Sequence, residues 1–270
     1  MSESLLLSRY KLTAFLACQR QFELRYLQKL PWPKRPLTEK NEALMARGQQ
    51  FHQLLQRHFL GWEIEPNSIG DAQVRQWYLR FQQSGLQLPN GRVLTEMSLT
   101  IPIGAHLLNG RFDLLILGEH DAGKPTAHLF DWKTGKAQDE SLLKQDWQTR
   151  LYLAMLAEGG SAILKENPNS LAPENISITY WYVTDPEQPR TIQYSAAQHT
   201  QNWQDLNMLV TQIESQIAQG DWPLTDDLTQ CQVCAYQTIC QRQRAGVADP
   251  ILEDEEEQAD VWETAVPQLP

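Results

Sequence analysis

An acid and a lysine two residues apart, Asp131 and Lys133 in the segment HLFDWKTGK (128–136), could do chemistry together. The apolar run before them predicts a β-strand, and side chains at positions i and i+2 of a strand point to the same face. Both head groups then share one small volume, as a metal-bound carboxylate and a neighbouring lysine would. The alternative is a same-face ion pair that contributes under about 1 kcal/mol to stability.

A second carboxylate, Asp113 in GRFDLL, lies inside the preceding predicted strand. If the strands at 106–117 and 127–134 pair across the turn between them, Asp113 can approach Asp131. Two such carboxylates repel each other unless one is protonated, and a divalent cation removes the conflict. Oxygen ligands favour Mg²⁺ or Mn²⁺, and Lys133 could then hold the attacking water or stabilise a developing negative charge.

Four further side chains could complete this site. His52, in a helical segment ahead of the strands, could add an imidazole ligand. Gln148 and Tyr152 are four apart in the helix after the Asp-x-Lys strand, so they share a face and could contact a phosphate or orient Lys133. Glu96, in the first predicted strand, is a candidate acid behind the metal ligands. Each of these residues has an ordinary alternative in surface exposure or packing.

The elements that must position these residues alternate in character. Apolar periodicity and helix-breaking residues predict helices over 4–30, 40–60, 71–84, 141–159 and 196–220. Segments rich in β-branched and other apolar residues predict strands over 93–103, 106–117, 127–134 and 176–185. Three strands, a helix and another strand between helical ends indicate an α/β core.

Charge is divided between a basic beginning and an acidic end. The net charge of the 270 residues is −10, yet residues 1–60 hold ten Lys or Arg against four Glu. Residues 251–270 hold seven acids and no Lys or Arg, and we expect this tail to be disordered. The negative total therefore does not exclude local contact with phosphate.

Several classes of protein are excluded by missing patterns. No apolar stretch of about 18 residues could span a membrane, and the first residues lack a signal-peptide layout. We therefore expect a cytoplasmic protein without membrane association. Gly135-Lys136 is followed by Ala137, so the phosphate-binding loop of a helicase is absent, and no G-x-S-x-G indicates a serine hydrolase.

The four cysteines are split into one and three: Cys18, then Cys231, Cys234 and Cys240 in the spacing C-x2-C-x5-C. In a cytoplasmic chain a disulfide is the poorer interpretation. Four thiolates suit either a structural Zn²⁺ or an iron–sulfur cluster. Zinc ligands more often come as two close pairs, and unliganded cysteines are the remaining alternative.

The sequence resembles the PD-(D/E)XK nuclease superfamily, specifically its RecB-like branch, over about residues 8 to 240. The resemblance rests on four features in this order: His52, GRFD, FDWKTG and QTRLY. The resemblance implies that a metal is bound by an imidazole, two acids and a main-chain carbonyl: His52, Asp113, Asp131 and Trp132. It also implies a catalytic lysine and two supporting residues: Lys133, Gln148 and Tyr152. Two positions depart from the family pattern, since Phe112 replaces a proline and Trp132 replaces a frequent tyrosine, but neither side chain is needed to bind the metal.

The cysteine pattern adds a second resemblance. CQRQFELRY with the distal C-x2-C-x5-C is similar to the iron–sulfur nucleases of the AddB and CRISPR-associated Cas exonuclease types, in which such a quartet binds a [4Fe–4S] cluster. Gln19 replaces the usual proline after the first cysteine. The cluster would fasten the first helix to the C-terminal segment, and Arg20, Arg242 and Arg244 could offset its negative charge.

Together these patterns predict an α/β, restriction-endonuclease-like fold: a mixed sheet flanked by helices, with a helical iron–sulfur cap built from both chain ends. We expect a helical region at 1–90, a nuclease core at 91–220, a cysteine segment at 221–250 and the acidic tail at 251–270.

The function expected from the resemblance is a Mg²⁺- or Mn²⁺-dependent DNA nuclease, an exonuclease on single-stranded ends, in DNA repair, recombination or CRISPR adaptation. A helicase or a CRISPR adaptation protein would be its partner. Two alternatives stay open: a catalytically silent nuclease fold that binds DNA or a partner, and a four-cysteine zinc interaction protein.

Overall fold

The computed structural model of the protein describes residues 4–31, 39–119, 123–164 and 171–248. The predicted disordered tail, 251–270, lies outside these residues. Six strands form one sheet: β1 (Leu6–Leu7), β2 (Arg92–Ile103), β3 (His106–Glu119), β4 (Pro125–Lys133), β5 (Ile176–Tyr182) and β6 (Arg190–Gln193). β1 pairs with β3 and β4 with β5 in parallel, whereas the other pairs are antiparallel. The prediction of a mixed sheet is confirmed.

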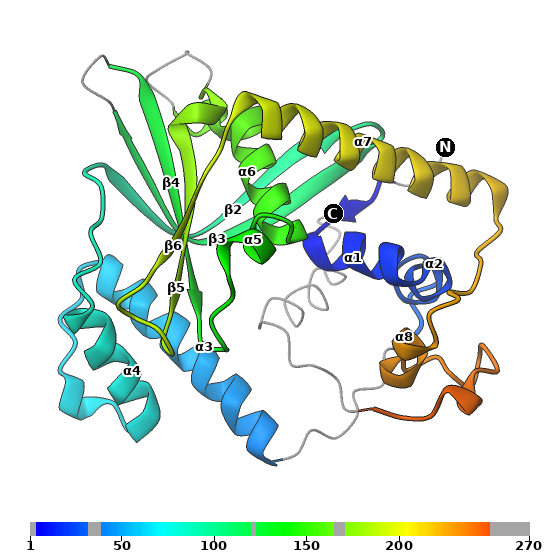
Figure 1. Ribbon diagram of the computed structural model, residues 1–270, viewed down its shortest axis with the longest axis horizontal. Coiled ribbons are helices and arrows are strands. Elements are labelled where there is room, and N and C mark those ends of the chain that lie inside the picture. The colour runs from blue at the N-terminus through cyan, green and yellow to red at the C-terminus, as the bar shows by residue number, and fades with distance from the viewer. Residues whose placement is uncertain (1–3, 32–38, 120–122, 165–170, 249–270) are drawn as a thin grey trace, which may run out of the picture.

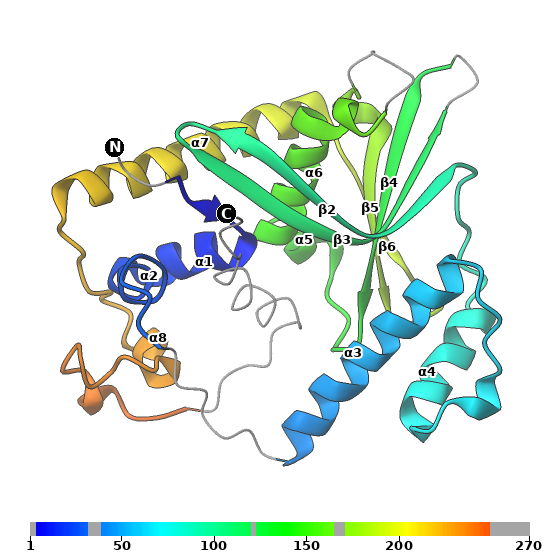
Figure 2. The ribbon, with the colours of Figure 1, turned by 180° about the vertical axis from the view of Figure 1, so that it is seen from behind.

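Helices flank the sheet on both faces (Figures 1 and 2). One face carries α3 (Glu39–Phe59) and α4 (Ala72–Gln83). The other carries α1 (Arg9–Ala17), α6 (Trp147–Gly159) and α7 (Ala196–Gln219). The remaining α-helices are short: α2 (Gln19–Phe22), α5 (Glu140–Leu143) and α8 (Leu228–Val233).

Each face of the sheet has its own apolar core. Leu114 and Trp132 pack with side chains of α3 and α4, whereas Phe112 and Leu115 pack with those of α6 and α7. Strict alternation along a strand would place residues 112 and 114 on the same face. The alternation of β3 side chains between the two faces of the sheet therefore shifts by one residue at Asp113.

The prediction of one helix over 4–30 is wrong. The chain instead forms the short strand β1, then α1, whose first turn is capped by the side chain of Ser8, and then α2. Cys18 separates the two helices because its backbone is extended, with φ −163° and ψ 111°. A π-helical turn, Glu23–Leu27, ends the segment. Apolar spacing alone did not reveal these breaks.

One edge of β3 is shared by two strands that approach each other end to end. β2 covers the opposite edge from His106 to Leu117. On the shared edge, β1 pairs at Leu107 and Leu108, and β4 pairs from Leu114 to Glu119. Because β1 runs parallel and β4 antiparallel to β3, their C-terminal ends both point toward residues 109–113.

Candidate active site

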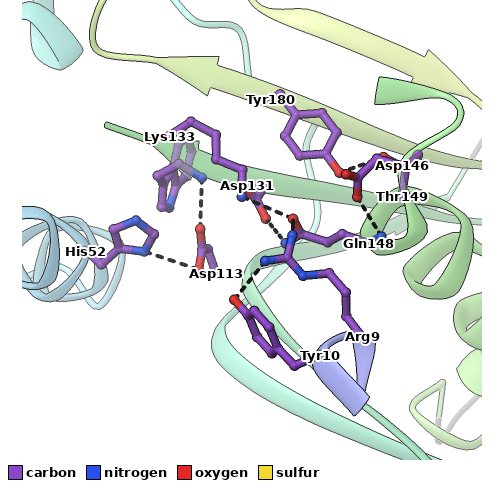
Figure 3. Close-up of polar contacts among 11 residues, drawn as sticks. Arg9, Tyr10, His52, Asp113, Asp131, Lys133, Asp146, Gln148, Thr149 and Tyr180 are labelled. Atoms are coloured by element: carbon purple, nitrogen blue, oxygen red, sulfur yellow. Dashed lines mark hydrogen bonds and ion pairs between the residues drawn. The ribbon is translucent and has the colours of Figure 1, made fainter. Parts of the chain in front are cut away.

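A group of metal-ligating side chains lies where these strand ends converge. His52 of α3, Glu96 of β2 and Asp113 of β3 each offer one nitrogen or oxygen within 4.8 Å of the others. His52 Nδ1 lies 3.3 Å from Asp113 Oδ1 (Figure 3). All three side chains are partly buried. One imidazole and two carboxylates are donors that suit Mn²⁺ or Mg²⁺.

Asp113 is held by the backbone of β4 as well. The paired register of β3 and β4 ends at Leu114 and Phe130, and beyond it the Trp132 amide donates to Asp113 Oδ2 at 2.8 Å. Burial opposes ionisation of this carboxyl. The carboxylate form is stabilised by the neighbouring His52, by the hydrogen bond from the Trp132 amide and by the charge of Lys133. Together these effects outweigh burial, so the pKa of Asp113 lies below its usual value.

Glu96 stands opposite Asp113 in a strained position of β2. Its φ is +50°, in the left-handed region that side chains larger than glycine rarely adopt. Arg111 Nε donates to Glu96 Oε2 at 2.6 Å. Burial, followed by the nearby Asp113 charge, raises the pKa of Glu96 despite Arg111. This carboxylate therefore lacks enough positive charge around it, which is a property expected of a cation ligand.

The sequence-predicted pair Asp131 and Lys133 forms a second group with Gln148. Lys133 Nζ lies 2.8 Å from Asp131 Oδ1 and donates to Gln148 Oε1 at 3.1 Å. Gln148 Nε2 donates to Asp131 Oδ2 at 2.7 Å (Figure 3). Gln148 is fixed at the start of α6 because its backbone amide donates to Oδ1 of the N-cap residue Asp146 at 2.7 Å. The lysine is thus held in one place by two buried partners.

An aromatic ring completes the environment of the lysine. Lys133 Nζ lies 5.8 Å from the centre of the Tyr180 ring. The Tyr180 hydroxyl is 2.8 Å from Thr149 Oγ1. Burial, then the Asp131 charge, raises the pKa of Tyr180 well above its ordinary value, so this phenol stays neutral. Its face can therefore stabilise the ammonium group without supplying a competing anion.

The predicted residues thus fall into two groups joined at Trp132, with one exception. His52 and Asp113 belong to the first group, and Asp131, Lys133 and Gln148 to the second. Tyr152 is placed in the core instead, where its ring packs edge-on against Phe112 at 4.9 Å and would lie 3.0 Å from a Cβ added at Gly110, closer than an ordinary contact.

One charged residue at the site has no counterpart in the sequence predictions. Arg9 Nη1 donates to Gln148 Oε1 at 2.9 Å, from the first turn of α1. No motif signals it, because the contact depends on the pairing of the two-residue strand β1 with β3. Glu96, by contrast, is predicted from the sequence as an acid behind the metal ligands, and the structure places it among the residues that could bind the metal directly.

Glu96→Gln should stabilise the metal-free protein at neutral pH by a few degrees in melting temperature. The raised pKa means that the fold disfavours the ionised carboxyl. This penalty is absent below the unfolded-state pKa, grows as the pH rises through the folded-state pKa and is complete above it. Added Mn²⁺ should reverse the order, since the parent binds it more tightly.

Thermal unfolding at several pH values, with and without Mn²⁺, checks this expectation. Glu119→Gln, on the exposed end of β3, is the matched control and should change neither the pH dependence nor the effect of Mn²⁺. A Glu96→Gln protein that gains as much from Mn²⁺ as the parent would exclude Glu96 as a ligand.

The four cysteines line a common pocket beyond the other end of α1. Its wall contains Cys18, Cys231, Cys234 and Cys240, together with Arg242. Burial, followed by the other thiols, raises the pKa of Cys234 to about 11 and also raises that of Cys240. Among the described residues, no three cysteine sulfurs lie within 4.8 Å of one another, so they are not gathered around a single ion.

The fold is a mixed sheet flanked by helices, with a candidate metal site where its strand ends converge. The family model of the PD-(D/E)XK nuclease superfamily matches residues 6–95 and 69–241. The protein therefore belongs to the PD-(D/E)XK nuclease superfamily. No curated protein matches it significantly. No helix among the described residues is long and apolar enough to cross a membrane.

Two solved structures are similar to the chain. One, from Eubacterium rectale and provisionally described as an exonuclease, has a TM-score of 0.52 and 11% identity, and the match covers 97% of this chain and 93% of that one. The other, SSO0001, has a TM-score of 0.37 and 16% identity, with coverages of 89% and 87%. The first likeness concerns the fold alone, and the second is too weak to support an argument.

Proposed function

We propose that the protein is a divalent-metal-dependent deoxyribonuclease that hydrolyses phosphodiesters at single-stranded ends. The observation that carries the proposal is the convergence of two groups at the end of β4. His52, Glu96 and Asp113 offer ligands for a cation, and the Trp132 amide connects them to the buried pair of Asp131 and Lys133. An ion pair with no catalytic role would not need possible metal ligands beside it.

Each residue has a distinct part in this reaction. Mg²⁺ or Mn²⁺, when bound, would activate water and polarise the scissile phosphate. His52, Asp113 and Asp131, with the Trp132 carbonyl, are the ligands that the family resemblance implies, and Glu96 is the ligand that the geometry adds.

Lys133 would stabilise the negative charge that develops on the phosphate, because Asp131 and Gln148 hold its ammonium group in a fixed position. Tyr152 supports this arrangement from the core, since its ring packs beneath β3 at Phe112.

The cysteine pocket is proposed to hold a [4Fe–4S] cluster that fastens α1 to the C-terminal segment. Four sulfurs around one Zn²⁺ with Zn–S bonds of about 2.3 Å would lie about 3.8 Å apart. The wider spacing of Cys18, Cys231, Cys234 and Cys240 around a common pocket fits a larger group better. Arg242 lines this pocket and Arg20 lies near Cys240, where both lower the electrostatic cost of thiolates.

Cleavage of matched DNA substrates tests the proposed activity. The full chain should degrade an end-labelled linear single strand with Mg²⁺ or Mn²⁺, and EDTA should stop the reaction. A circular single strand of the same sequence should survive if action begins at an end, and a blunt duplex should be cut more slowly. Rapid cleavage of the circle would replace the exonuclease proposal by an endonuclease.

The cleavage assay, the metal content of the protein and its co-purifying partners separate the alternatives. Metal-independent DNA binding without any cleavage would identify a catalytically silent binding module. A colourless protein containing zinc would identify the four-cysteine zinc alternative. Co-purification with a helicase or with CRISPR adaptation proteins would distinguish the two proposed pathways, DNA repair or recombination and CRISPR adaptation.

A further inference from the structure

Arg9 reaches the active-site side chains through the topology of the sheet. β1 ends at Leu7 and β4 ends at Lys133, and the two strand ends point at each other along the same edge of β3. Arg9 Nη1 then donates to Gln148 Oε1 at 2.9 Å, and Lys133 Nζ donates to the same oxygen at 3.1 Å (Figure 3). Two cations therefore converge on one neutral acceptor.

Arg9 and Lys133 place two positive charges beside Gln148. Acids face Lys133 from two strands, since Asp131 pairs with it and its charge helps to lower the pKa of Asp113. Asp131 and Gln148 are only 5% and 3% exposed, so charges here are weakly screened. A phosphodiester oxygen that reaches Arg9 beside Lys133 would therefore be attracted by both cations.

The guanidinium group is also held ready in a fixed position. Arg9 Nη2 donates to the Tyr10 hydroxyl at 2.7 Å, and the guanidinium carbon lies 4.5 Å from the centre of the Tyr10 ring. Tyr10 is 8% exposed and so is anchored in the core. A guanidinium that is positioned in advance loses little entropy on binding a phosphate, and its planar fork suits two phosphate oxygens.

We propose that Arg9 binds non-bridging oxygens of a substrate phosphodiester beside Lys133. The inference rests on the proposed nuclease function and deepens it, since it extends the substrate site from β4 and α6 to the start of α1. Arg9 would contact one phosphate and no base, so it would add affinity without sequence preference.

The test pairs Arg9→Gln with single-stranded oligonucleotides that each carry one uncharged methylphosphonate linkage at a different position. Binding is measured in EDTA, so that no turnover is needed. The parent should lose about 10- to 100-fold in affinity at one particular linkage, the range for a charge-assisted hydrogen bond. Arg9→Gln should bind unmodified DNA more weakly than the parent does, and it should lose less additional affinity than the parent at that linkage, where Lys133 is the remaining cation of the pair. Its salt dependence should also fall by about 0.7 in slope, as for one lost phosphate contact.

Two further variants make the result specific. Arg57→Gln removes an exposed arginine of α3 that stacks on Trp62, and it should match the parent throughout. Arg9→Lys should keep part of the affinity, because it retains the charge but not the planar fork. Melting temperatures establish that each variant is folded.

Distinct outcomes would overturn the proposal. If Arg9→Gln loses the same additional affinity as the parent at every methylphosphonate, Arg9 only positions Gln148. If Arg9→Gln binds unmodified DNA as tightly as the parent, Arg9 contributes no phosphate contact. Linkage-specific binding by a parent protein that never cleaves DNA would instead contradict the nuclease function and support the phosphate site.

Discussion

Lys133→Met should lower the rate of DNA cleavage by about 10²-fold or more at saturating metal. The methionine side chain retains length but loses the charge that would stabilise the phosphate. It also leaves the Asp131 carboxylate buried with Gln148 as its remaining partner in this group, so we expect a loss of about 3–5 kcal/mol in the free energy of unfolding. Single-turnover cleavage and thermal unfolding measure the two effects separately.

Lys133→Arg separates catalysis from stability. Arginine keeps the ion pair with Asp131, so most of the lost stability should return. Its guanidinium cannot occupy the position of an ammonium group held at 2.8 Å and 3.1 Å from Asp131 and Gln148, so the rate should stay low. A Lys133→Met protein that is folded and cleaves at the parent rate would remove the lysine from the mechanism.

Cys18→Ser should cause the largest loss of stability among the cysteine variants, together with loss of bound iron. Of the four proposed ligands, Cys18 joins α1 to α2 and the other three belong to the C-terminal segment, so a bound cluster would depend on Cys18 to strengthen the contacts that already join these segments, such as that of the Tyr236 hydroxyl with the Leu30 carbonyl. Because ligand binding and folding are coupled, we expect several kcal/mol of destabilisation. Iron analysis, the visible absorption spectrum and thermal unfolding measure the effect.

A pocket residue without sulfur provides the control. Gln21 lines the same pocket as Cys18, and Gln21→Ala should keep its iron and its brown colour. Full iron content and unchanged stability in Cys18→Ser would exclude Cys18 as the fourth ligand. Retained packing between Trp222 and Phe22, whose rings stack at 6.1 Å, would then be sufficient to dock the C-terminal segment.

The local part of the site could be predicted from the sequence because strand and helix periods are local properties. The two-residue spacing of Asp131 and Lys133 predicts a shared face, and their charged groups lie 2.8 Å apart. The helix that follows β4 brings Gln148 back to the same strand end. Tyr152 follows Gln148 by four residues in the same helix, but helical spacing alone does not indicate that its ring packs in the core against Phe112.

The remaining parts depend on contacts between distant segments. At Glu96 and Asp113 the regular alternation of side chains along β2 and β3 is interrupted. A glutamate in a sequence gives no indication that its backbone will adopt a left-handed conformation. Arg9 lies near Gln148 only because a two-residue strand pairs with the shared edge of β3, and such a short strand cannot be recognised by its pattern.

Single-turnover cleavage by the parent and by Asp113→Asn, measured across a series of Mn²⁺ concentrations, tests the central claim most directly. Asp113 contacts both His52 and the Trp132 amide, so asparagine keeps the shape while removing the charge that a cation needs. We expect saturable metal dependence in the parent and a loss of at least about 10³-fold in the folded variant, comparable to losing several kcal/mol of charge stabilisation. Cleavage by the parent in EDTA, or equal rates for the two proteins, would contradict a metal-dependent nuclease built on this site.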